Sequence, residues 1–192
     1  MNRARAYRAP LLLVTAATAL VAFVSCSTRQ PETPATPAAP AMSPVQRGEY
    51  LVAITGCNDC HTPGALFGAP DLKRALSGSE LGWRGPWGVS YASNLTPDTE
   101  TGIGTWTDVE IERALRSGVK KDGSPVAPPM PWPDFARLSP DDMAAMIAYL
   151  RTLPAVKHKN PGPIPPGHAA AGSIITLPMP SAWDVPKPPE TK

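Results

Sequence analysis

The strongest hydrophobic pattern of the chain lies between Ser139 and Pro154. Ser139 is a favoured N-cap residue, Pro140 suits a first helical turn, and Pro154 cannot continue a helix. Between them, four apolar residues recur at intervals that place them on one helical face: Met143, Met146, Ile147 and Leu150. Such a stripe normally packs into a core, so we predict a buried helix and do not expect Met143 or Met146 to ligate a metal.

Two further helices are expected upstream. Residues 45–55 carry apolar positions at near-helical spacing. Residues 107–117 begin with Thr107, a favoured N-cap, and Glu110 three residues later completes a capping box. Gly118 follows as a typical helix stop. These signals predict one helix before residue 57 and another in the middle of the chain.

Stretches rich in Pro and Gly separate and flank these helices. Residues 63–88 and 123–133 are predicted to be loops. The folded domain is therefore expected over residues 43–154, as an all-α unit. Residues 26–42 are rich in Pro, Ala and Thr, cannot bury a core, and are predicted to form an extended tether. Residues 155–192 form a Pro-rich tail that either wraps the domain or is disordered.

The N-terminus has the pattern of an export signal. Three arginines precede an uncharged, largely apolar stretch, Leu11–Val24, which is shorter than the ~20 residues that a membrane span needs. We predict a secretory signal peptide over residues 1–25. The stretch ends in Phe23-Val24-Ser25-Cys26, which resembles a bacterial lipoprotein box and predicts that a lipid on Cys26 anchors the protein to a membrane. Ordinary cleavage near Ser25 and an uncleaved anchor are the alternatives.

Composition and charge narrow the possible functions. Of the 192 residues, 26 are Pro and only 6% are aromatic, so a bound group would help to fill the core of the domain. Without the three N-terminal arginines, 15 Lys and Arg stand against 16 Asp and Glu, and no basic stripe suggests nucleic-acid binding. The adjacent Lys120 and Lys121 are expected to lie in a solvated turn.

The most specific motif in the sequence is Cys57-Asn58-Asp59-Cys60-His61. In a helical turn, two cysteines separated by two residues match the two vinyl groups of a haem, to which their thiols add as thioethers. The next residue then offers its imidazole to the iron, which explains the Cys-x-x-Cys-His attachment pattern. We therefore predict one covalent haem c at Cys57 and Cys60, with His61 as an axial iron ligand.

Other uses of these cysteines fit the sequence less well. A zinc site needs four ligands, but the predicted domain offers no further cysteine, and His158 and His168 lie in the tail. A thioredoxin-like pair requires a strand–helix context, whereas this motif follows a predicted helix. A Cys57–Cys60 disulfide would leave the adjacent His61 unexplained.

The second axial position of the iron is assigned to Met130. Met and His are the expected ligands, and the prolines of Pro128-Pro129-Met130-Pro131 stiffen the backbone that presents this thioether. Met179, also between prolines, is the rival, followed by His158 and His168. Three residues of the 63–88 loop either bind the haem carboxylates or only pack: Trp83, Arg84 and Trp87.

Several short stretches resemble known proteins. Arg47–Leu51, followed by Cys57–Pro63, resembles the opening of a class I cytochrome c domain. Residues 93–106, 129–131 and 148–151 resemble the cytochrome domains of membrane-associated bacterial alcohol, aldehyde and gluconate dehydrogenases. The resemblance covers residues 44–154.

The resemblance implies a small class I cytochrome c fold with His61 and Met130 as iron ligands. It also implies that Gly48 and Tyr149 mark the contact between the first and last helices. Those dehydrogenase subunits carry several haem domains, whereas this chain has one attachment motif. We therefore expect an electron carrier and not an enzyme. It would connect a dehydrogenase or other donor to an oxidase or cytochrome acceptor, on the periplasmic side of a bacterial membrane. An open-site haem enzyme or sensor, such as a peroxidase or gas binder, is the alternative.

Overall fold

The computed structural model describes residues 42–178. The predicted signal peptide, the lipid-bearing Cys26 and the rival ligand Met179 lie outside these residues, as does nearly all of the predicted tether. Within residues 42–178, no helix combines the length and the apolar character that crossing a bilayer requires.

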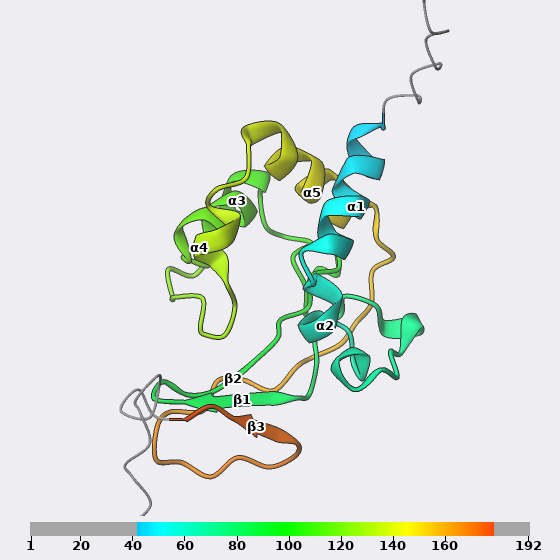
Figure 1. The fold of residues 1–192 in the computed structure, drawn as a ribbon. Helices are drawn as coiled ribbons and strands as arrows, with labels where there is room; N and C mark the ends of the chain where they lie inside the picture. The colour runs from blue at the N-terminus through cyan, green and yellow to red at the C-terminus, as the bar shows by residue number, and fades with distance from the viewer. Residues whose placement is uncertain (1–41, 179–192) are drawn as a thin grey trace, which may run out of the picture. The chain divides into compact units, whose positions relative to one another are not determined.

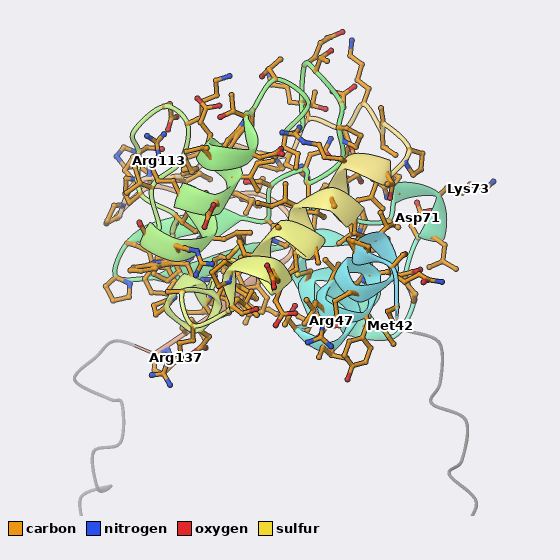
Figure 2. The ribbon with its side chains drawn as sticks, turned by 90° about the horizontal axis from the view of Figure 1, so that it is seen from above. Met42, Arg47, Asp71, Lys73, Arg113 and Arg137 are labelled. Atoms are coloured by element: carbon orange, nitrogen blue, oxygen red, sulfur yellow. The ribbon has the colours of Figure 1, made fainter. Side chains whose placement is uncertain are left out.

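The first and last helices of the domain pack against each other. Figure 1 shows α1 (Pro44–Ile54) beside α5 (Pro140–Thr152), and Figure 2 shows the same pair from above. The core around them also takes buried residues from α3 (Asp108–Ser117) and α4 (Trp132–Phe135). The predicted stripe of α5 is confirmed, because all four of its residues are buried: Met143, Met146, Ile147 and Leu150.

The ends of these helices follow the predicted caps. Thr107 and Glu110 form the capping box of α3, and Gly118 closes this helix with a φ of 65°, which L side chains rarely adopt. Ser139 accepts a hydrogen bond from the backbone N–H of Asp142 at 3.1 Å and so caps α5. Local sequence signals therefore define where these two helices begin.

Gly48 allows α1 and α5 to approach closely. A Cβ atom at this position would lie 1.9 Å from the carbonyl oxygen of Ala145 and 2.8 Å from Cβ of Tyr149. The expected contact of Gly48 and Tyr149 between the first and last helices is therefore confirmed.

Gly48→Val is expected to lower the free energy of unfolding by about 3 kcal/mol, at the upper end of typical overpacking costs, because a backbone carbonyl cannot move aside as a side chain can. Urea unfolding followed by circular dichroism measures the change. Gly162→Ala is the control, since a Cβ there would have nothing within 4 Å. Equal midpoints for the two variants would contradict the close packing of α1 on α5.

The described residues also contain a three-stranded sheet, so the all-α prediction covers only the helical part. β1 (Gly82–Gly85) pairs antiparallel with β2 (Gly88–Tyr91) and parallel with β3 (Ile174–Thr176), in the order β2-β1-β3. β1 lies in the stretch predicted as a loop, and β3 lies in the predicted tail. Strands this short, two of them with glycines, show no apolar–polar alternation from which they could be predicted.

The remainder of the long loop is mostly irregular. Two short 3-10 turns, Ala65–Phe67 and Leu72–Arg74, interrupt it. The second predicted loop is irregular up to Pro131, and α4 begins at Trp132.

Candidate haem-binding site

One helical turn carries the three predicted attachment residues. Thr55 and Gly56 separate α2 (Cys57–His61) from α1, and Gly56 has a φ of 72°, in the left-handed region that favours glycine. Residues three apart in a helix share a face, so Cys57 and Cys60 lie together and His61 follows at the end of the turn. Figure 1 shows α2 directly below α1, between the helices and the sheet.

The surroundings of His61 fix which ring nitrogen is available to a metal. His61 is only 8% exposed, and its Nδ1 lies 2.6 Å from the carbonyl oxygen of Ser93. Because a carbonyl only accepts, Nδ1 carries the hydrogen and Nε2 keeps its lone pair. Burial lowers the pKa of His61, although the bond to Ser93 acts in the opposite direction. The result is a neutral imidazole with Nε2 free, which is the form that ligates iron.

Both cysteines of α2 are free thiols and half-buried. Burial is the largest cause of a raised pKa at Cys57 and also at Cys60. A dithiol redox centre requires the opposite, a thiol pKa lowered by its surroundings. Within residues 42–178, no group of three or more His, Cys, Asp or Glu side chains is arranged to hold a metal ion. The described residues therefore give no support to the thioredoxin-like or zinc alternatives.

Cys57, Cys60 and His61 line a cavity of ≈ 1280 Å³, which is larger than the roughly 300–1,000 Å³ of common small-molecule sites. Much of its wall is apolar and comes from α3, α4, α5 and the chain before α3: Ile103, Trp106, Ile111, Leu115, Phe135 and Leu150. A large apolar cavity beside two free thiols and a ligating imidazole fits a macrocycle with two vinyl groups and a central iron.

Met130 lines the same cavity, from the loop before α4, and packs against the hydrophobic core. Met146 also lines it, but this side chain is 1% exposed and belongs to the core stripe of α5. The structure thus brings Met130 into one cavity with Cys57, Cys60 and His61.

The two histidines of the tail lie elsewhere. The ring of His158 lies 3.1 Å from Ser77 Oγ and 2.9 Å from Glu80 Oε1, and His158 does not line the cavity. His168 borders a separate, smaller cavity beside Arg84. Neither histidine is placed to ligate a metal opposite His61.

Residues 45–154 match the protein-family model described as cytochrome c. The chain belongs to the cytochrome c family. A cytochrome c domain implies covalently bound haem c, which agrees with the thiols, the imidazole and the apolar cavity described above.

Curated relatives carry the same domain in longer chains. The chain is 46% identical over 105 residues to the cytochrome c subunit of a quinone-type alcohol dehydrogenase from Gluconobacter oxydans, covering 55% of this chain and 20% of that protein. It is 34% identical over 140 residues to a gluconate 2-dehydrogenase cytochrome c subunit from Pantoea cypripedii, covering 72% and 28%. A dihaem cytochrome c-type protein from Cereibacter sphaeroides is 34% identical over 108 residues, covering 56% and 36%. This cytochrome therefore spans only a fifth to about a third of each of these relatives.

The three candidate residues for the haem carboxylates lie in different places. Trp83 lines the main cavity, whereas Arg84 borders the smaller one. The indole N–H of Trp87 donates to Ser90 Oγ at 3.2 Å. Only Trp83 of the three thus reaches the cavity that Cys57, Cys60 and His61 line.

Sequence reasoning missed two contributions to the site. The carbonyl of Ser93 orients His61, but a backbone group leaves no signature in a sequence. Residues of the predicted tail line the cavity, among them Lys159 and Asn160. Lys157 and Lys159 were the only available signal in this part of the sequence.

Proposed function

We propose that this cytochrome holds one haem c and transfers single electrons outside the cytoplasm. In this proposal Cys57 and Cys60 attach the haem, and His61 and Met130 are the axial iron ligands. The observation that carries the proposal is that these four residues line one cavity while the bond to Ser93 leaves His61 Nε2 free. A single attachment motif in the full sequence supports a single haem.

The residues of the chain prepare the site for rapid electron exchange. The carbonyl of Ser93 holds the imidazole in one orientation, and the prolines around Met130 limit the motion of its backbone. The apolar wall would provide a nonpolar environment for a bound haem. The haem itself supplies the one-electron couple, and Met/His ligation favours a raised reduction potential, which suits an acceptor of electrons from dehydrogenases.

The relatives support a dehydrogenase as the electron donor. Two of them are named as cytochrome c subunits of alcohol and gluconate dehydrogenases. We propose that this cytochrome receives electrons from such a donor and passes them to a respiratory oxidase or another cytochrome.

An open-site haem enzyme would need an acid–base group near the iron. Among the described residues that line the cavity, His61 is the only histidine. Asp59 and Glu100 also line the cavity, but Asp59 is exposed and Glu100 pairs with Lys157 at 2.6 Å. These observations favour the carrier over a peroxidase or a gas sensor.

Stopped-flow mixing distinguishes the two functions. The purified oxidised protein is mixed with a reduced quinoprotein or flavoprotein dehydrogenase, and separately with peroxide in the presence of an excess of a small-molecule electron donor. We expect rapid reduction by a dehydrogenase and slow reaction with peroxide. Fast turnover of peroxide, without reduction by any dehydrogenase tried, would support the enzyme instead.

We further propose that a lipid on Cys26 holds the protein on the periplasmic side of a bacterial membrane, because the apolar stretch before it ends in a lipoprotein-like box. Two or more acyl chains anchor a protein stably. The mature protein is therefore expected to begin at Cys26 and to partition into detergent. Mass spectrometry of its N-terminal peptide checks this, and a mature terminus downstream of Cys26 would rule the lipid out.

A further inference from the structure

The segment after α5 packs along the domain beyond the part that matches the family model. Its first residues form hydrogen bonds to the chain before α3: the N–H of Val156 donates to Thr96 Oγ1 at 3.1 Å, and the N–H of His158 donates to Thr101 Oγ1 at 3.0 Å. Farther along, Ile164 and Val89 exchange two backbone hydrogen bonds of 2.8 and 2.9 Å. Residues 155–178, which we call the strap, are thus fixed to the domain and end in β3.

The strap forms part of the cavity wall. Five of its residues line the haem cavity: Lys157, Lys159, Asn160, Pro161 and Pro163. The segment that the strap contacts lines the cavity with Glu100 and Thr101. The polar residues among them are Lys157, Lys159, Asn160, Glu100 and Thr101, whereas the cavity wall that comes from α3, α4 and α5 is apolar. A haem has the same division, since its macrocycle is apolar and its two propionate side chains are carboxylates.

Only one of the two lysines in this polar part has an acidic partner among the described residues. Lys157 pairs with Glu100 at 2.6 Å. Lys159 forms no ion pair with any other residue of the range 42–178, although it lines the cavity. A carboxylate entering here therefore meets one cation that is already paired and one that is available.

Asn160 gives a second, independent sign of a missing partner. Its Nδ2 donates to the carbonyl of Ser77 at 3.0 Å, but its Oδ1 is buried without any hydrogen-bond partner among the described residues. A buried acceptor without a donor is costly, and a water molecule shared with a nearby carboxylate would satisfy it. Ser77 is followed by Gly78, whose N–H donates to the carbonyl of His61 at 2.8 Å. Asn160 is therefore close to the segment that carries the proposed iron ligand.

We propose that the strap holds a propionate of the haem, with Lys159 as the charged partner of that carboxylate and Asn160 beside it. The inference rests on the proposed haem attachment to α2 and adds a role for residues outside the family match. A cation held near the haem stabilises the reduced iron, which carries one positive charge fewer than the oxidised iron. Lys159 thus contributes to the reduction potential of the protein.

Redox titration of the full-length haem protein tests the role of Lys159. Lys159→Met is expected to shift the reduction equilibrium toward the oxidised form by about threefold to tenfold, a lower midpoint potential of up to about 59 mV for one electron. Lys159→Arg keeps the charge and should restore most of the potential. Lys73→Met is the matched control, because this substitution removes the same positive charge. The side chain of Lys73 points outward at the edge of the molecule (Figure 2), and it does not line the cavity.

The midpoint potentials test the role of Lys159, whereas the content of covalent haem tests the proposed function. Equal midpoints for Lys159→Met and Lys73→Met would overturn the role of Lys159, as would a Lys159→Arg protein that behaves like Lys159→Met. Covalent haem is measured in each variant from the alkaline pyridine spectrum. Pigment that leaves the wild-type polypeptide on denaturation would instead contradict the proposed function itself.

Discussion

Replacing Cys57 and Cys60 together with alanine is expected to remove essentially all covalent haem from the protein. The two thiols share one turn of α2 and line the cavity with His61, and the chain offers no other thiol there. Thioether bonds survive denaturation, whereas axial ligation does not. A denaturing gel stained for haem therefore measures attachment directly, and the wild-type band should keep its pigment.

The loss of haem should also destabilise the domain. Without the macrocycle, the apolar wall of a cavity of ≈ 1280 Å³ would face water, and the buried side chains around it would lose their contacts. We expect the double variant to accumulate poorly and to show little cooperative unfolding. Cys26→Ser is the control for the loss of a cysteine, because Cys26 lies outside the predicted domain and this variant should keep its full pigment. A pigmented Cys57→Ala, Cys60→Ala protein would refute the attachment site.

Met130→Ala is expected to open one face of the iron. The oxidised protein should lose the weak absorption band that arises from sulfur–iron ligation, and the reduced protein should bind carbon monoxide rapidly. The reduction potential should fall by a substantial part of the roughly 0.8 V range that axial ligands set. Visible spectroscopy, carbon monoxide mixing and redox titration measure these three effects.

Met146 and Met179 provide the controls for this substitution. Met146 lines the same cavity but is 1% exposed in the core stripe of α5, so Met146→Leu should preserve the sulfur–iron band and cost little stability. Met179→Leu should also preserve it. A band that survives in Met130→Ala and disappears in either control would assign the ligand to the other methionine.

Helices α3 and α5 could be predicted from the sequence, but the sheet could not. The capping box of Thr107 and Glu110 and the α5 stripe involve residues at most a few turns apart, so their patterns are visible in the sequence and the structure has both helices. β1 has only the sequence Gly82-Trp83-Arg84-Gly85, and its parallel partner β3 begins at Ile174. This pairing joins segments about ninety residues apart, so no pattern among neighbouring residues predicts it.

The sequence by itself predicted the chemistry of the proposed attachment site, because the spacing of Cys57, Cys60 and His61 within one turn is a local property. It also determined the helix caps and the apolar face of α5. The tertiary structure decided which distant groups complete the cavity. It formed the hydrogen bond between His61 and the carbonyl of Ser93. It also brought Met130, Lys159 and Asn160 to the wall of the cavity that His61 lines. The physical reason is that these arrangements depend on the packing of the whole chain, whereas thiol spacing and helix capping depend only on neighbouring residues.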